Sequence, residues 1–395
     1  MRGVADTAER TRQELALQLA LGPALMSTRG HNAPEVEIAY QGARRLSEQL
    51  GDDRASFASV WGLWLTRGSR SKRASRRKLA DELLRAAERL GDRGLLLEAH
   101  HAGWATDIAG ASYVSGGEHV CKGLALYDPE QHRSHALIYG GHDPAVCGKG
   151  QRAMMLWLLG YPDRAVQEAR EGIVLAEGLT HVPSVGHALW FAAMASQLRR
   201  DPRAVLDLAE RLLAIGSEHG LGQHQSIGGI MHGWASARLA DMEGGLSELR
   251  RSVISHGGTQ RSYFNTILAE TELRAGHLES ATAALNNAAT ISDELGETFW
   301  QAGTMCVEGD LTLARSAGDW RAAQDLYSRA IAIAREQQAK SLELRAGTRL
   351  ARLWGVQGRR AEARELLAPI YGWFTEGFDT RDLKEAKALL DELMA

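Results

Sequence analysis

Apolar residues recur three and four positions apart along most of the chain, and short polar or glycine-containing turns separate the apolar stretches. This spacing places the apolar side chains on one face of a helix. Alanine, leucine, glutamate and arginine, which favour helices, dominate between the turns, and runs of β-branched residues are scarce. The pattern therefore predicts an all-α protein.

The turns recur about every 40 residues. The clearest occupy residues 159–165, 199–204, 274–281, 316–323 and 356–363. Each turn leads to an alanine near the start of a helix: Ala165, Ala204, Ala281, Ala323 and Ala363. Between the second and the third of these, Gly245 takes the matching place. About twelve residues before these markers lies another small residue: Ala153, Ala192, Gly233, Ala269 and Ala351, with Gly309 if its helix is longer by two residues.

A small–large–small trio follows several turns, as in Ala281, Leu285 and Ala288, in Ala323, Tyr327 and Ala330, and upstream in Ala80, Leu84 and Ala87. Residues three and four apart share a helix face, so each trio forms one packing stripe. Two helices with small residues at these places are typical of tetratricopeptide (TPR) repeats, here stretched from 34 to about 40 residues. One such unit cannot bury its own apolar face and must stack on its neighbours.

We therefore predict a TPR-like α-solenoid, a right-handed superhelix of about nine helical hairpins that occupies residues 1–395 as one domain. In the less regular N-terminal half, helix pairs are expected at 8–50, 54–90 and 93–127. Residues 128–143 form a connector that interrupts the repeats, and a polar amphipathic helix at 379–393 is suited to capping the array.

Composition limits the classes of function that the protein could have. The 46 basic and 49 acidic residues nearly cancel, which gives no overall reason to expect a nucleic-acid partner. No segment approaches 18 consecutive apolar residues, so we expect no membrane span. The three cysteines are too widely spaced for a disulfide framework or a CxxC metal pair: Cys121, Cys147 and Cys306. A reducing compartment, the cytoplasm, fits this usage.

The stretch GGHDPAVCGKGQ, residues 140–151, is similar to a phosphate-binding loop. A Walker loop would need a glycine at position 143 and a hydroxyl after Lys149, but Asp143 and Gly150 stand there. Asp143 followed by Pro144 instead favours the start of a helix. Elsewhere no carboxylate pair or glycine elbow accompanies a nucleophile, so we predict a protein that is not an enzyme and needs no cofactor. Nucleotide binding through Lys149 stays an alternative.

Two further clusters have a chemical and a plainer interpretation. His132, His135, His142 and Cys147 could in principle bind zinc, but their spacing matches no closed zinc finger, and we predict no metal site. The run at 67–78 carries seven basic residues: Arg67, Arg70, Lys72, Arg73, Arg76, Arg77 and Lys78. We interpret it as a solvated turn, offset by acids at 81, 82 and 88, with anion or nucleic-acid binding as the alternative.

Residues 9–26, 124–147, 156–165 and 341–390 together resemble one known region, and YGWFTEGFDTRDLKEA (371–386) is the most specific piece. They are similar to the C-terminal TPR half of bacterial signalling proteins in which a class III adenylyl/guanylyl cyclase domain and a STAND-type ATPase domain come first. The architecture also resembles the effector-sensing superhelix of MalT-like regulators. The resemblance implies a stand-alone or truncated sensor array with a cyclase/ATPase module as partner. No position here matches the family's catalytic residues.

In such superhelices the first helix of each pair lines the inner groove. The repeat markers place aromatic and charged side chains there, which suit a protein segment, a peptide or a small polar effector. The alternative for the tryptophans is packing between repeats. The candidate binding residues are Trp157, Trp234, Arg238, Tyr263, Glu270, Asp310 and Arg352. We predict a non-catalytic binding module.

Overall fold

The computed structural model describes residues 2–29, 33–67 and 73–394. In this part of the chain the backbone forms twenty α-helices, one turn of 3-10 helix (Ala317–Asp319) and no strand, which confirms the all-α prediction. None of the described helices is both long enough and apolar enough to cross a membrane.

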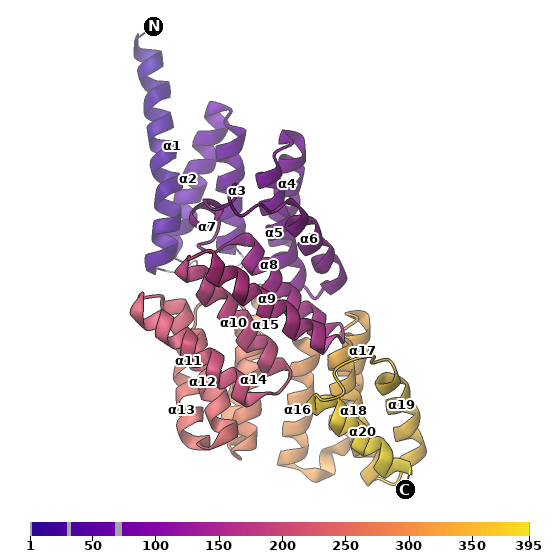
Figure 1. The fold of residues 1–395 in the computed structure, drawn as a ribbon. Helices are drawn as coiled ribbons and strands as arrows, with labels where there is room; N and C mark the ends of the chain where they lie inside the picture. Colours follow the sequence, from indigo (N-terminus) through magenta and orange to yellow (C-terminus); the bar gives the residue numbers. More distant parts are fainter. Residues whose placement is uncertain (1, 30–32, 68–72, 395) are drawn as a thin grey trace.

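The described helices pair into nine hairpins (Figure 1). The first four are α1 (Arg2–Arg29) with α2 (Pro34–Leu50), α3 (Asp53–Arg67) with α4 (Arg73–Leu90), α5 (Arg93–Ala109) with α6 (Tyr113–Leu126), and α8 (Pro144–Leu158) with α9 (Pro162–Gly178). The next five are α10 (Val182–Leu198) with α11 (Pro202–Glu218), α12 (Gly222–Leu239) with α13 (Met242–Ser255), α14 (Arg261–Arg274) with α15 (Leu278–Leu295), α16 (Gln301–Arg315) with α17 (Trp320–Glu336), and α18 (Lys340–Val356) with α19 (Arg360–Gly372). The short α7 (His135–Ile138) lies in the connector, and α20 (Arg381–Met394) follows the last hairpin.

Local sequence rules set where many helices begin. Asp92, Asp143, Asp201 and Asp241 each precede a helix, and each carboxylate accepts a backbone N–H from the first turn of that helix. Such capping satisfies donors that have no partner inside the helix. At the end of α2, Gly51 adopts a φ of 65°, a left-handed conformation that glycine takes without strain.

The small residues that mark the repeats let the two helices of a hairpin approach closely. A Cβ on Gly233 of α12 would lie 2.7 Å from the carbonyl oxygen of Gly245 on α13. A Cβ on Gly309 of α16 would lie 2.4 Å from the ring of Tyr327 on α17. The helix itself is not longer than its counterparts, because α16 ends six residues after Gly309 as α12 ends six residues after Gly233; the extra spacing lies in the following turn, which forms the 3-10 helix. Ala323 and Ala330, which flank Tyr327 in its trio, are fully buried.

The superhelix curls back on itself, so hairpins far apart in sequence touch (Figure 1). The hydroxyl of Tyr113 in α6 donates to the carbonyl of Phe299 at 2.8 Å, just before α16. The hydroxyl of Ser341 in α18 donates to the carbonyl of Trp157 in α8 at 2.5 Å. These contacts join the third hairpin to the start of the eighth and the fourth to the ninth, and they bring the C-terminal helices against the middle of the chain.

Residues 73–78 of the basic run belong to α4 and not to the solvated turn that the sequence indicated. Residues 68–72 lie outside the described residues, as do the side chains of Arg67 and Arg73. Of the remaining basic residues, Arg76 lies 4.8 Å from the ring centre of Trp64, and Arg77 forms an ion pair with the buried Asp107. These two side chains stabilise the packing of α4 on its neighbours and do not belong to an exposed basic patch. Among the described basic side chains of the run, only Lys78 is exposed.

A candidate binding cavity on the inner wall

The first helix of each hairpin from α12 to α18 faces the inside of the superhelix. Together with α20 and the turn after α10, these helices enclose a cavity of about 350 Å³, which we call the inner cavity. Its charged lining comprises seven arginines and four carboxylates: Arg200, Arg238, Arg274, Arg345, Arg349, Arg352 and Arg381 against Glu270, Asp310, Asp382 and Glu385. The excess of positive charge attracts anionic ligands.

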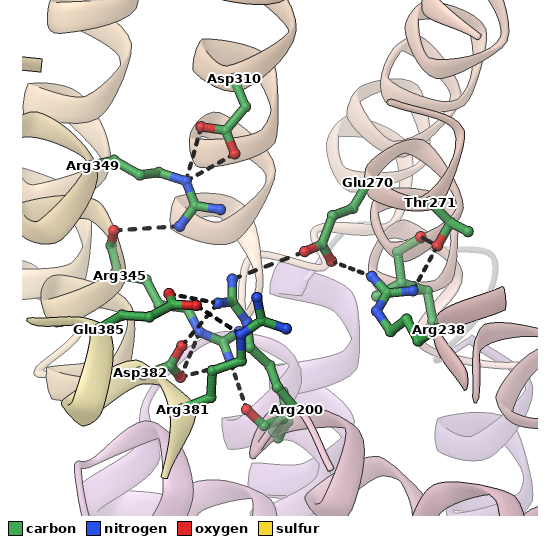
Figure 2. Close-up of polar contacts among 12 residues, drawn as sticks. Arg200, Arg238, Glu270, Thr271, Asp310, Arg345, Arg349, Arg381, Asp382 and Glu385 are labelled. Carbon is green, nitrogen blue, oxygen red and sulfur yellow. Dashed lines mark hydrogen bonds and ion pairs between the residues drawn. The ribbon is translucent and has the colours of Figure 1, made fainter. Parts of the chain in front are cut away.

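Glu270 of α14 lies between Arg238 and Arg200 (Figure 2). Its carboxylate is 3.4 Å from a guanidinium nitrogen of Arg238 and 3.9 Å from one of Arg200. Burial alone would favour the neutral acid, but Arg238 and Arg200, with Arg349 and Arg345 farther off, outweigh it and lower the pKa of Glu270 to about 2. Glu270 therefore stays ionised and neutralises part of the arginine charge.

The guanidinium of Arg345 joins three elements. It lies 4.6 Å from the ring centre of Trp157 in α8 and donates to the carbonyl of Leu198 at the end of α10. It also donates to Asp382 of α20 at 2.9 Å (Figure 2). Arg200 contacts the same carboxylate at 3.4 Å and Glu385 at 3.2 Å. The first two turns of α20 therefore supply the acids that hold these arginines at one end of the inner cavity.

Arg349 of α18 and Asp310 of α16 form a separate ion pair. The Nε of Arg349 is 3.0 and 2.9 Å from the two carboxylate oxygens, and the hydroxyl of Tyr327 donates to the same Asp310 at 2.8 Å. Nearby acids raise the pKa of Arg349 despite its burial. This pair is structural, because its polar atoms already satisfy one another.

Two arginines of the lining stand apart from these pairs. Arg274, at the end of α14, and Arg352, in the last turns of α18, are exposed. Within the described part of the chain the structure shows neither of them in an ion pair. A guanidinium presents a planar fork of N–H donors that matches a carboxylate or a phosphate group. These two side chains are the cations best placed to bind an anion that enters the cavity.

Five of the seven candidate residues from the sequence line the inner cavity: Trp234, Arg238, Glu270, Asp310 and Arg352. The other two are covered by packing. Trp157 lies beneath Arg345, and Tyr263 donates to Gln197 and packs edge-on against Trp300, with ring centres 5.0 Å apart. For these two side chains the packing alternative describes their place in the structure. It also describes Trp234, which is 1% exposed and has the guanidinium of Arg238 at 4.2 Å from its ring centre.

Sequence reasoning missed most of the arginines. Arg349 and Arg345 precede Arg352 by about one and two turns of the same helix, so a search for cations at helical spacing around Arg352 would have found both. Arg200 and Arg381 carry no such signal, because a turn and the last helix meet only when the superhelix closes.

The Lys149 stretch has a structural role. Residues 144–158 form α8, and the carboxylate of Asp143 accepts the backbone N–H groups of Ala145 and Val146 at its start. The amine of Lys149 is 3.2 Å from Glu168 and 2.7 Å from Glu171, both on α9. Two acids beside the amine compete with any phosphate, so the geometry favours the helix interpretation.

No family model matches the chain. An uncharacterized protein of Rhizobium meliloti (strain 1021) is 27% identical over 367 residues, which are 90% of this chain and 34% of the relative. The chain thus spans about a third of the length of that curated relative. Among solved structures, a Rap protein complexed with competence and sporulation factor has a TM-score of 0.63 and 11% identity, covering 96% of this chain and 99% of that one. The apo quorum sensor NprR from B. thuringiensis has a TM-score of 0.52 and 12% identity, covering 92% and 98%. These likenesses show the fold, a TPR-like α-solenoid.

Proposed function

We propose that the chain is a non-catalytic binding module whose inner cavity takes a carboxylate-bearing segment of a peptide or protein. The observation that carries this proposal is the lining, in which seven arginines face four acids and two of the arginines, Arg274 and Arg352, have no acidic partner among the described residues. Trp234 and Trp300 lie in the wall of the same cavity and are 1% and 5% exposed. Arginine and tryptophan are the residues that most often contribute strongly to protein interfaces.

The proteins that share the fold support a role in signal recognition. The Rap structure is a complex with competence and sporulation factor, and NprR is a quorum sensor. The sequence resembles the TPR region of cyclase–STAND ATPase proteins, and the Rhizobium relative is about three times as long as the match. We therefore propose that the chain acts as one continuous sensor domain that regulates a cyclase/ATPase module.

Binding of acidic peptides tests the proposal. Fluorescence anisotropy would compare the affinities of two dye-labelled peptides of equal length. One peptide carries glutamates at the positions where the other carries glutamines. We expect the wild-type protein to prefer the glutamate peptides, and the double variant R274E/R352E to bind them at least about tenfold more weakly, because two attractive contacts become repulsive.

The matched control is R251E/R329E, which reverses two exposed arginines on the outer helices α13 and α17. Its net charge equals that of the cavity variant, so a loss caused only by the overall charge would appear in both. Equal affinities of the two double variants, or no preference of the wild type for glutamate, would contradict the proposal.

The alternative of nucleotide binding makes a different prediction. Calorimetry with ATP and Mg²⁺ would show heat of binding that K149A abolishes and R274E/R352E leaves unchanged. Because the Lys149 amine already contacts two carboxylates, we expect no binding that depends on it.

A further inference from the structure

Three side chains from three elements meet outside the inner cavity. They are His101 of α5, His142 of the connector and Cys147 of α8, and one possible ligand atom from each lies within 4.8 Å of the others. The Nε2 atoms of the two histidines are 3.4 Å apart. In tetrahedral zinc sites, bonds of about 2.0–2.3 Å place neighbouring ligand atoms roughly 3.3–3.8 Å apart. We propose that this cluster binds Zn²⁺.

The chemistry of the three groups favours zinc over the hard cations. Thiolate and imidazole are ligands of zinc and related transition metals, whereas magnesium and calcium select oxygen. Three protein ligands leave one tetrahedral position for water or an exchangeable ligand. On binding, the Cys147 thiol loses its proton to solvent and its sulfur donates to the metal.

A buried carboxylate orients the first of these ligands. Glu98 lies one turn before His101 on α5 and is fully buried. One of its oxygens is 3.0 Å from Nδ1 of His101, and the other is 2.8 Å from Nδ1 of His135. A carboxylate that accepts the Nδ1–H of a histidine leaves Nε2 as the ligating nitrogen, and this arrangement accompanies most zinc-bound histidines.

Burial and neighbouring side chains hold the ligands in place. His101 is 2% exposed and Cys147 is 1% exposed. The amide of Gln151, one turn after Cys147, donates to its sulfur at 3.3 Å. The ring of His142 stacks on that of His187 with centres 3.8 Å apart, and Nε2 of His187 is buried without a hydrogen-bond partner among the described residues. Buried polar atoms normally have a hydrogen-bond partner, so the unpartnered Nε2 of His187 beside the cluster is consistent with a ligand that binds there.

The ligand set departs from the sequence prediction of no metal site. Of the four residues weighed there, His142 and Cys147 do converge. His132 and His135 instead contact Asp128 of the connector and Glu98 of α5. His101 completes the cluster from 41 residues before His142 in the chain. A bound zinc ion would tie the connector to both α5 and α8.

Metal titration of the full chain, after removal of bound metal with a chelator, tests the proposal. Co²⁺ is the first probe, because a cobalt–thiolate bond adds a charge-transfer absorption band and a tetrahedral site gives strong visible bands. We expect about one Co²⁺ per chain, full displacement by Zn²⁺, and a rise in the melting temperature on metal addition. A wild-type protein that binds neither ion in stoichiometric amount overturns the proposal.

Variants separate this site from weak surface binding. C147A should remove the charge-transfer band and weaken Zn²⁺ binding by about a hundredfold or more, whereas E98Q should weaken it by about 10–100-fold and keep the band. C121A changes an exposed cysteine on α6 and should match the wild type. H142Q, on the connector, provides a second ligand variant if C147A does not fold. An unchanged Zn²⁺ affinity in a folded ligand variant overturns the assignment.

Discussion

Glu270 neutralises part of the charge of two arginines in the inner cavity, Arg200 and Arg238. Its pKa is lowered to about 2 by the surrounding arginines, well below the ordinary value of 4.5. The ionised form is therefore more stable in the folded protein than in the unfolded one. This stabilisation is complete above about pH 4.5, and it disappears as the pH falls from there to about 2.

The variant E270Q tests this balance, because it removes the charge and keeps the shape. We expect its free energy of unfolding at pH 7 to be lower than that of the wild type by about 2 kcal/mol, since Arg200 and Arg238 lose their common partner and the side chain is only 26% exposed. Urea unfolding at a series of pH values measures the difference, which should shrink toward zero below pH 3. E308Q, at an exposed acid of α16, should change little at any pH.

Individual site residues could be predicted only as far as a single helix orders them. Trp234, Arg238, Glu270, Asp310 and Arg352 follow from their register on the first helix of a repeat, and they do line the inner cavity. His101 could not be paired with His142 and Cys147, because its place beside them depends on how the connector folds over α5. That placement is set by packing, which no local pattern encodes.

At the scale of elements, the sequence carries the turns and the small residues at the helix contacts, since both rest on short-range rules. Asp–Pro and glycine turns end and begin helices in the described residues as capping chemistry predicts. The closeness of paired helices follows from glycine and alanine at fixed spacing. What the pattern does not contain is the rotation between successive hairpins, which depends on many side chains at once.

The contact between Gly233 of α12 and Gly245 of α13 gives a direct test of the close packing of the two helices in one hairpin. A methyl group on Gly245 would lie 2.4 Å from the backbone nitrogen of Ala237 and 2.7 Å from the carbonyl oxygen of Gly233. Both atoms belong to the backbone of α12 and cannot rotate away. We expect G245A to lower the free energy of unfolding by about 1–3 kcal/mol, because α12 and α13 must separate. Thermal or urea unfolding measures this loss.

The matched control is G117A, a glycine inside α6 whose added methyl meets nothing within 4 Å. Alanine favours a helix more than glycine does, so this variant should gain about 0.5–1 kcal/mol. If G245A were as stable as G117A, close approach of the two helices would not be what the small residue provides.

At the scale of the whole molecule, closure distinguishes this chain from an open repeat array. In an open solenoid each repeat contacts only its neighbours. Here the loop before α20 caps a helix more than 200 residues earlier. Glu376 accepts the backbone N–H groups of Asp163 and Arg164 at 2.9 and 3.0 Å, and Asp163 in return accepts the N–H of Gly377 at 2.9 Å. This reciprocal cap fastens the C-terminal end to the first turn of α9.

The variant E376A should therefore loosen two distant segments together. Loss of a capping carboxylate costs about 1 kcal/mol, and the backbone donors at the start of α9 lose their partner. Hydrogen exchange read by mass spectrometry should rise both in 162–166 and in 373–381, and the inner cavity should loosen with them, because Asp382 of α20 holds Arg345. E365A, an exposed acid of α19, serves as the control. Faster exchange near residue 376 alone would mean that the superhelix is stable without this contact and that the cavity does not depend on closure.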